Sequence, residues 1–261
     1  MITAGIDSGA ENTKAVILGE DKVLAYSIIP QGTVSSLPVA QRALAEATER
    51  ARISPGEINY VISTGSGSEH IAFAHEQATE SSCCARGTTW LLPDTDTVID
   101  IGADKCLVVK CQRGKPFKTA RNDRCAAGSG RFLKIAAKPL GIEVEEMGEL
   151  SLQSRVAIGI ESTCAVFAES EIISLIHQRY RTEDIARAVF KGLASRIYTL
   201  VVKVGFAKNL VMVGGIARNP GMVKAMEEQA GCHILIPQEP IIVGALGAAL
   251  IAREKKKVSS S

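Results

Sequence analysis

The chain contains the same arrangement twice: an apolar strand that ends in Asp-x-Gly. The first copy ends at Asp7-Ser8-Gly9 and the second at Asp100-Ile101-Gly102. In each half, two more strand-like stretches follow through tight turns, and a stretch with helical periodicity comes next. Strands then alternate with helices. The pattern predicts a mixed α/β fold with two related lobes.

The remaining elements can be assigned to ranges. Strands are predicted at 58–63, 210–213 and 233–236, and helices at 169–178, 182–204, 220–228 and 242–253. We expect lobe I to span 1–93 and to be completed by a C-terminal helix at 240–255. Lobe II is expected to span 94–239, with a linking segment around Cys83 and Cys84 between the lobes.

Composition excludes several classes of protein. Of 261 residues, 46% are hydrophobic, which is enough to fill the core of a globular chain of this length. The 30 basic and 28 acidic residues nearly cancel, so no general field attracts nucleic acid or an anionic membrane. No apolar stretch reaches the ~18 residues of a membrane span, and no signal peptide is evident. The expected location is the cytoplasm.

The Asp-x-Gly turns have a definite chemistry. A glycine turn after a buried strand presents successive backbone N–H groups, and these can hold a phosphate without a basic side chain. The carboxylate beside it suits a hydrated Mg²⁺ ion, which takes few protein oxygens. One such turn is compatible with an ordinary β-hairpin. Two turns at equivalent places, Asp7 and Asp100, favour phosphate and metal binding.

Four segments together resemble the superfamily of actin, Hsp70 and sugar kinases. GIDSGAENTK, from Gly5 to Lys14, resembles its first phosphate loop, and VIDIGAD, from Val98 to Asp104, its second. LVMVGGIARN, from Leu210 to Asn219, resembles the adenosine loop, and IVGALG resembles the second connecting helix. Neither GxxxxGK[ST] nor GxGxxG occurs in the chain.

This resemblance implies an actin-like, ribonuclease H-like ATPase fold with ATP or ADP and Mg²⁺ in a cleft between the lobes. The catalytic residues that it implies are Asp7, Asp100 and Asp104. The nucleotide-binding residues that it implies are Ser8, Gly9, Ala10, Asn12, Thr13, Lys14, Gly102, Ala103, Gly214, Gly215, Asn219 and Gly244.

Two of the seven cysteines, Cys125 and Cys164, each stand just before a predicted helix. A helix N-terminus stabilises a thiolate and an anionic cluster, so both are candidate iron–sulfur ligands. A [4Fe-4S] cluster needs four thiolates, and a twofold dimer supplies them from two chains. The alternative is two buried cysteines in helix caps. The other cysteines, Cys83, Cys84, Cys106, Cys111 and Cys232, are expected to be ordinary thiols, most of them buried.

The segments around these cysteines, NDRCAAGSGRFL and ESTCAVFAESEII, resemble the activases of 2-hydroxyacyl-CoA dehydratases and the ATP-hydrolysing subunits of benzoyl-CoA reductases. The resemblance implies that Cys125 and Cys164 of two subunits hold one [4Fe-4S] cluster. It also implies that ATP hydrolysis drives a low-potential electron into a partner acyl-CoA dehydratase or reductase. Ferredoxin or flavodoxin would be the electron donor. A homodimer is expected, and a heterodimer with a paralogous ATPase subunit is the alternative.

The second phosphate loop departs from the common activase pattern Gly-Gly-Gln-Asp, because it reads Gly102-Ala103-Asp104-Lys105. Asp104 occupies the position of the glutamine, and orienting the attacking water and acting as a base are both open roles. The variation is closer to benzoyl-CoA reductase subunits.

Two other functions are compatible with the same fold. A small-molecule kinase, for example a sugar kinase, would transfer phosphate and would not need Cys125 or Cys164. A non-catalytic ATP-sensing protein would bind nucleotide with negligible hydrolysis. The absence of an evident sugar-binding insertion and the two cysteine motifs favour the electron activator.

Overall fold

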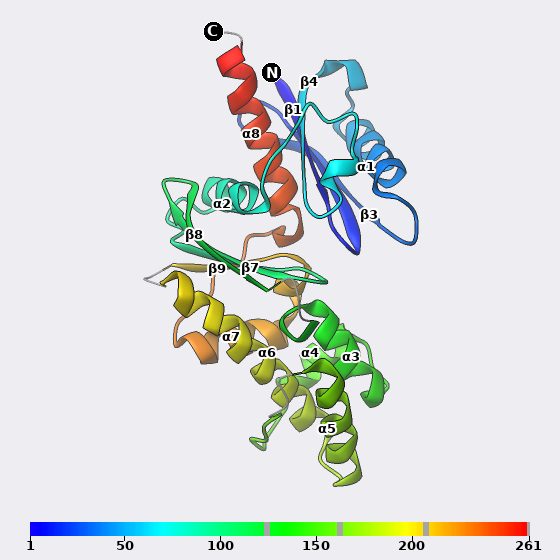
Figure 1. Ribbon diagram of the computed structural model, residues 1–261, viewed down its shortest axis with the longest axis vertical. Coiled ribbons are helices and arrows are strands. Elements are labelled where there is room, and N and C mark those ends of the chain that lie inside the picture. Colours follow the sequence, from blue (N-terminus) through cyan, green and yellow to red (C-terminus); the bar gives the residue numbers. More distant parts are fainter. Residues whose placement is uncertain (123–125, 161–163, 206–208, 260–261) are drawn as a thin grey trace. The chain divides into compact units, whose positions relative to one another are not determined.

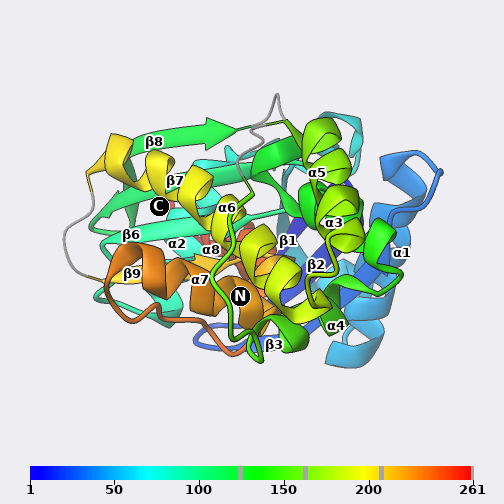
Figure 2. The ribbon, with the colours of Figure 1, turned by 90° about the horizontal axis from the view of Figure 1, so that it is seen from below.

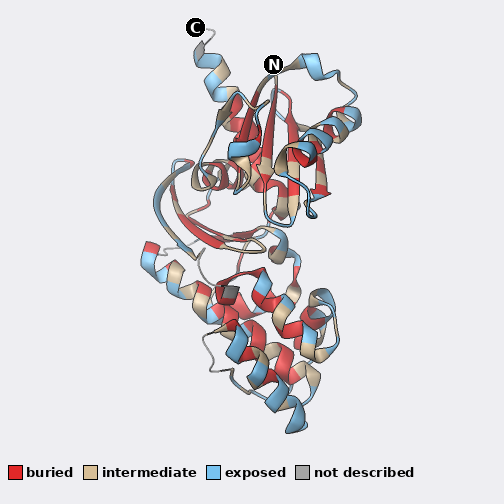
Figure 3. Ribbon diagram, turned by 45° about the vertical axis from the view of Figure 1, so that its right-hand side comes forward, coloured by how far each residue is buried: buried red, intermediate tan, exposed pale blue. Residues whose placement is uncertain are grey.

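The computed structural model describes residues 1–122, 126–160, 164–205 and 209–259, and this part of the chain forms two compact units. Unit 1 contains residues 1–95, 111–117 and 237–261, and unit 2 contains residues 96–110 and 118–236. The described residues form two sheets, one in unit 1 and one mainly in unit 2 (Figure 1). Each sheet packs against its own hydrophobic core. Most strands are buried, whereas the outward faces of the helices are exposed (Figure 3). No helix in these ranges is long and apolar enough to cross a membrane.

The sheet of unit 1 has five strands in the order β3-β2-β1-β4-β5. Their bounds are β1 Ile2–Ser8, β2 Asn12–Leu18, β3 Val23–Pro30, β4 Ile58–Thr64 and β5 Glu76–Gln77. The first three strands pair antiparallel through short turns, whereas β4 pairs parallel with β1 after the crossover helix α1 (Ser36–Ala51). Because parallel strands run in one direction, β1 and β4 end at the same edge of the sheet.

Helices cover both faces of this sheet, because alternate residues of a strand point in opposite directions. Ala15 and Ile17 of β2 share an apolar cluster with helix α1. Val16 and Leu18 share another with helix α8 (Val243–Ser259). The core of unit 1 therefore lies in two layers, one on each side of β1 and β2.

Helix α2 (Glu80–Leu91) packs against α8 at very close range. A β-carbon on Gly87 would lie 2.2 Å from the carbonyl oxygen of Val243. One on Gly247 would lie 1.8 Å from the carbonyl oxygen of Cys83. Gly87 and Gly247 thus allow the backbones of α2 and α8 to meet.

The second sheet, most of which belongs to unit 2, has the order β8-β7-β6-β9, which matches β3-β2-β1-β4 of unit 1. Its strands are β6 Thr97–Ile101, β7 Cys106–Gln112, β8 Lys115–Asn122 and β9 Leu210–Val213. As in unit 1, the first strand pairs antiparallel with the second and parallel with a strand from later in the chain. The predicted repetition of one plan is confirmed.

Five α-helices of unit 2 surround a core that contains the buried rings of Phe132 and Phe190. They are α3 Gly130–Leu140, α4 Val144–Ser151, α5 Ala165–His177, α6 Thr182–Val204 and α7 Pro220–Ala230. The long α6 runs through the middle of this layer and packs against α7 and α4 (Figure 2).

Two kinds of element differ from the sequence-based prediction. The predicted strand at 233–236 is wrong: Leu235 forms a single bridge with Val211, and Pro237, which has no N–H to donate, follows two residues later. Helices α2 and α4 were not predicted. Thr79 caps α2 by accepting from the Ser82 N–H at 3.3 Å, and packing on α8 compensates for its weak helix formers.

Candidate functional site

The first Asp-x-Gly turn lies at the end of β1 in unit 1. Asp7 stands opposite Lys14 in the β1–β2 pair, and the Lys14 Nζ atom lies 3.2 Å from Asp7 Oδ2. The Gly9 N–H donates to the Asn12 carbonyl at 3.1 Å, which closes the turn. Both charged side chains are mostly buried. The carboxylate is therefore held in place by its ion pair before any ligand arrives.

Two more backbone segments reach Asp7. Thr64 of β4 lies opposite Asp7, and Gly65 follows with a φ of 89°. A β-carbon on Gly65 would lie 2.5 Å from Asp7 Oδ1, and one on Gly244 would lie 3.1 Å from Oδ2. Only glycine fits at position 65, because the φ is positive and because a β-carbon there would collide with the Asp7 carboxylate. Gly244 was among the predicted site residues; Gly65 was missed, although a glycine directly after the parallel neighbouring strand was a usable signal.

The side chains of the first turn divide into two sets. Ser8 is buried, and its Oγ has no hydrogen-bond partner in the described chain. Thr13 is also buried and donates its hydroxyl to Gln31 Oε1 at 2.7 Å. Gly9 and Ala10 lie at the tip of the turn, outside the buried core. Of the predicted phosphate-loop residues, Ser8 and Thr13 therefore point into unit 1.

The second Asp-x-Gly turn has equivalent geometry in unit 2. Val213 of β9 lies opposite Asp100, and Gly214 follows with a φ of 88°. A β-carbon on Gly214 would lie 2.7 Å from Asp100 Oδ1 and 2.5 Å from the Ile101 carbonyl oxygen. Gly65 therefore lies against Asp7 in the same way as Gly214 lies against Asp100. The two aspartate turns are duplicated in backbone conformation as well as in sequence.

Helix α3 fixes the loop after Asp100. The N–H groups of Gly130 and Arg131 donate to the carbonyls of Gly102 and Ala103 at 3.0 and 2.7 Å. Asp104 forms an ion pair with Arg131 at 2.8 Å, and both side chains are substantially exposed. Gly102, Ala103 and Asp104 therefore lie together at the N-terminus of α3.

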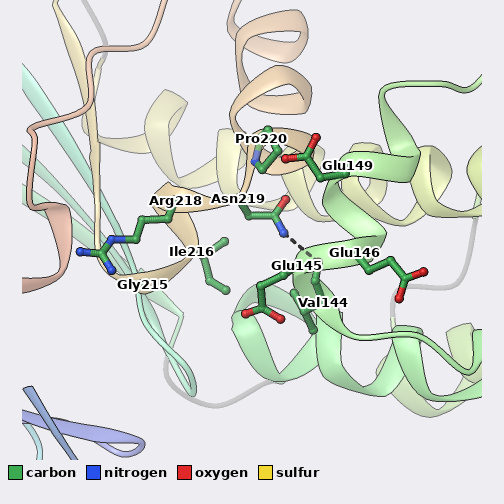
Figure 4. A pocket seen from close by; sticks show the side chains of 9 residues that line it. All are labelled: Val144, Glu145, Glu146, Glu149, Gly215, Ile216, Arg218, Asn219 and Pro220. Carbon is green, nitrogen blue, oxygen red and sulfur yellow. Dashed lines mark hydrogen bonds between the residues drawn. The ribbon is translucent and has the colours of Figure 1, made fainter.

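The predicted adenosine loop forms one wall of a pocket of about 330 Å³ in unit 2 (Figure 4). The opposite wall is the first part of α4. The lining residues are Val144, Glu145, Glu146, Glu149, Gly215, Ile216, Arg218, Asn219 and Pro220. Carboxylates outnumber the one guanidinium by three to one, so the pocket offers acceptors to a ligand that donates hydrogen bonds. The volume is in the range of small-molecule sites. Sequence reasoning missed the α4 glutamates because it missed that helix.

Asn219 lies in this pocket with its side chain engaged by protein. Its Nδ2 donates to the Val144 carbonyl at 2.9 Å, and its Oδ1 accepts from the Met222 N–H at 3.2 Å, which caps α7. It is 6% exposed. The predicted nucleotide-binding residue thus connects α4 with α7.

Of the two candidate cluster ligands, Cys164 lies in the described part of the chain and Cys125 does not. Cys164 is the N-cap residue of α5 and is half-buried, with its carbonyl accepting from the Ala168 N–H at 2.9 Å. Its predicted place at a helix start is confirmed. Cys125 lies outside the described residues. In the described part of the chain that follows it in sequence, Arg196 donates to the Ala127 carbonyl at 3.1 Å, and its guanidinium lies 4.6 Å from the centroid of the Phe132 ring.

The other cysteines are as expected. Cys83, Cys84, Cys106 and Cys111 are buried, and Cys232 is half-buried. Burial raises the pKa of Cys83 to about 12 and also raises the pKa of Cys106, so neither is a reactive thiolate at neutral pH. In the described ranges, no three His, Cys, Asp or Glu side chains come together to hold a metal ion.

Asp184, at the start of α6, accepts hydrogen bonds from residues 154–156, which precede Cys164 in the chain. Its Oδ1 accepts from Ser154 Oγ at 2.8 Å and from the N–H groups of Arg155 and Val156 at 3.0 and 3.1 Å. Burial alone would raise the pKa of Asp184, but these hydrogen bonds outweigh it and the pKa lies below its ordinary value. The carboxylate anchors this loop in its ionised form.

We expect Asp184→Asn to lower the stability of unit 2 at pH 7, because the amide is a weaker acceptor for three donors. A group with a depressed folded-state pKa stabilises the fold above its unfolded-state pKa of about 3.9 and loses that effect as the pH falls further. Urea midpoints measured from pH 7 to pH 2 should therefore converge for the two proteins below about pH 4. A difference that stays constant down to pH 2 would contradict this assignment.

Comparisons with known proteins identify the family of this chain. The model of the BadF/BadG/BcrA/BcrD ATPase family matches residues 4–252. The 2-hydroxyisocaproyl-CoA dehydratase activator of Clostridioides difficile is 40% identical over 262 residues, which cover 99% of this chain and 97% of that protein.

Two solved structures match almost the whole chain. Component A of (R)-2-hydroxyglutaryl-CoA dehydratase from Acidaminococcus fermentans has a TM-score of 0.95 at 36% identity, covering 98% of this chain and 99% of that one. The activator of the 2-hydroxyisocaproyl-CoA dehydratase from Clostridium difficile, solved with bound ADPNP, has a TM-score of 0.93 at 38% identity, covering 100% and 97%. The predicted actin-like ATPase fold is confirmed.

Two more matches bear on the alternatives. A benzoyl-CoA reductase subunit of Thauera aromatica is 31% identical over 261 residues, covering 95% of this chain and 92% of that one. The second phosphate loop favoured the benzoyl-CoA reductase subunits, but over the whole chain the dehydratase activator, at 40%, has the higher identity. A ROK hexokinase from Thermus thermophilus matches at 14% identity with a TM-score of 0.55, which shows the fold alone and does not favour a kinase. The chain belongs to the BadF/BadG/BcrA/BcrD ATPase family.

Proposed function

We propose that this protein is an ATP-dependent electron activator: it couples ATP hydrolysis to the transfer of a low-potential electron to a partner acyl-CoA dehydratase. The observation that carries the proposal is the duplicated aspartate turn, Asp7 with Gly65 and Asp100 with Gly214. It occurs in a chain 38% identical to an activator solved with bound ADPNP. A partner reductase of the benzoyl-CoA type is the second possibility.

In this proposal each aspartate turn contributes part of the nucleotide site. The backbone N–H groups around Gly9 and Gly102 hold phosphate oxygens, and Asp7 and Asp100 hold Mg²⁺ through its water shell. The ion neutralises phosphate charge when it is bound. Lys14 is already fixed beside Asp7 and supports a phosphate from the same edge of the sheet. Asp104 orients the attacking water or accepts its proton.

The pocket between α4 and the adenosine loop is the proposed place for the nucleoside. A ribose donates hydroxyl protons and an adenine donates amino protons, and the carboxylates of Glu145 and Glu149 are acceptors for both. Gly215 lets the backbone approach the ligand closely. Differential affinity of ATP and ADP for two arrangements of the chain would couple hydrolysis to electron transfer.

We propose that Cys125 and Cys164 from two subunits hold one [4Fe-4S] cluster, which supplies one-electron transfer when bound. A half-buried thiol at the start of the 13-residue helix α5 suits such a ligand. Beside it, Val166 and Phe167 are 66% and 68% exposed, so an apolar surface adjoins the thiol. A second copy of the chain, or a paralogous subunit, would cover that surface.

The remaining partners follow from this role. A ferredoxin or flavodoxin would supply the electron, and the dehydratase that receives it would hold the acyl-CoA. The cytoplasm, which keeps thiols reduced, is the expected location.

Anaerobic purification tests the cluster. We expect about four iron and four sulfide per two chains, and Cys164→Ser or Cys125→Ser should abolish both while ATP still binds. Cys232→Ser, which alters a half-buried thiol outside the proposed site, is the matched control and should retain the cluster. Colourless wild-type protein, or full iron content in Cys164→Ser, would refute the cluster assignment.

Hydrolysis separates the activator from an ATP-sensing protein with the same site. The sensor binds ATP with negligible turnover, whereas the activator should release phosphate from ATP without any phosphorylated small molecule as product. A phosphorylated product would instead support the kinase.

A further inference from the structure

Asn219 connects three elements of unit 2 through its own backbone and side chain. Its N–H donates to the Ile216 carbonyl at 3.0 Å, which closes the adenosine loop. Its Oδ1 accepts from the Met222 N–H and so caps the N-terminus of α7. Its Nδ2 donates to the carbonyl of Val144, the first residue of α4. With 6% of its surface exposed, the residue is a buried junction.

Gly148 makes room for this junction. A β-carbon at Gly148 would lie 2.4 Å from Asn219 Oδ1 and 2.6 Å from Nδ2. Glycine is a poor helix former, and alanine would suit the middle of an eight-residue helix better on propensity alone. The amide of Asn219, which occupies that space, explains why the helix has glycine there.

The two walls of the pocket meet at this junction. Glu145 and Glu149 are four residues apart and share one face of α4, while Ile216 and Arg218 belong to the opposite wall. Figure 4 shows Asn219 between these walls, with its hydrogen bond directed to Val144. At 2.9 Å, this bond ties the adenosine loop directly to the backbone of α4.

We infer that Asn219 and Gly148 form a clamp that sets the spacing of the pocket walls, so that Asn219 is a positioning residue for the nucleoside. The inference rests on the proposed ATP site. Carboxylate acceptors that are already in place when the ligand arrives need no ordering on binding, and this favours affinity. The clamp therefore contributes to nucleotide affinity and not to the chemistry at Asp7 and Asp100.

Asn219→Ser tests the clamp because it separates the two functions of the side chain. Serine caps helices about as well as asparagine, so α7 keeps its cap, but serine lacks the amide that reaches Val144. We expect the Kd of a fluorescent ATP analogue to rise about 3- to 10-fold, because the pocket walls must then be ordered when the ligand binds. The kcat at saturating ATP should stay near wild type, whereas the melting temperature without nucleotide should fall modestly, because the Val144 carbonyl loses its buried donor. Unchanged affinity would overturn the inference.

Asn59→Ser is the matched control. Asn59 is an exposed residue of unit 1 that accepts from the Ile2 N–H at 3.0 Å. The control should bind nucleotide as wild type does. An equal loss of affinity in Asn59→Ser and Asn219→Ser would overturn the assignment to the clamp.

A double-mutant cycle tests the contact without nucleotide. Gly148→Ala should lower the melting temperature because the new methyl group collides with the Asn219 amide. The pair Gly148→Ala with Asn219→Ser should be more stable than the sum of the single effects, because the shorter side chain relieves the collision. Additive effects would overturn the clamp. Wild-type protein that binds no ATP would instead refute the proposed function, and the cycle distinguishes the two failures.

Discussion

Gly247→Ala is expected to destabilise unit 1 by on the order of 3 kcal/mol or more, a large part of the stability of an ordinary domain. The new β-carbon would lie 1.8 Å from the Cys83 carbonyl oxygen and 2.5 Å from its carbonyl carbon. Both are backbone atoms of α2, so no side chain can rotate away. The helices α2 and α8 must separate, and α8 also covers β1, whose last residues form the first aspartate turn.

Gly192→Ala in α6 is the matched control. Gly192 is also a helical glycine, but among the described residues its β-carbon would meet no atom closer than the Ile160 carbonyl oxygen at 3.8 Å, an ordinary contact. Alanine should therefore stabilise the helix by about 0.5–1 kcal/mol. Urea unfolding of the full chain should move in opposite directions for the two variants. An unchanged midpoint for Gly247→Ala would show that α2 and α8 do not meet as closely as described.

The paired glycines also illustrate what sequence alone can and cannot predict. The alternation of strands and helices, the two Asp-x-Gly turns and the place of Cys164 before a helix are local patterns, and each was predicted from the sequence. The helix itself was expected at 169–178 and begins earlier, at Ala165. Helix α2 has serine, threonine and glycine among its residues, and those give no helical signal. It forms because its buried thiols and Gly87 pack on α8, which is a tertiary effect.

The site divides in the same way. Asp7, Asp100 and their glycines were identifiable because they repeat in sequence. Gly65 and the α4 glutamates were missed, since their roles depend on which strand or helix lies beside them. Asn219 belongs to a recognisable motif, but its use as a link between α4 and α7 depends on Gly148, 71 positions earlier in the chain. Contacts of that separation leave no local pattern.

Asp7→Asn and Asp100→Asn are each expected to lower the kcat of ATP hydrolysis by roughly 100- to 1,000-fold, the usual loss when one preorganised electrostatic contact is removed. Asparagine keeps the shape of the side chain and removes the charge that would hold the hydrated metal ion. In Asp7→Asn the Lys14 ammonium also loses a mostly buried partner at 3.2 Å, so this variant should melt at a lower temperature as well.

Phosphate release at saturating ATP and Mg²⁺ measures the effect, with nucleotide affinity followed separately. If either variant hydrolyses ATP at the wild-type rate, its aspartate is not part of the site. Lys14→Met separates the ion pair from the metal, because it removes the partner of Asp7 and leaves the carboxylate charge in place.

Asp104→Asn completes the series and decides between the two roles left open for that residue. Its ion pair with Arg131 is exposed, with 42% and 61% of the two side chains accessible, so loss of the pair should cost at most about 1 kcal/mol and leave the fold intact. A change in kcat therefore reports chemistry. If Asp104 accepts the proton of the attacking water, kcat should fall roughly 100-fold or more and its pH dependence should lose one limb. If it only orients the water, the amide should serve nearly as well, and a loss of less than about 10-fold is expected.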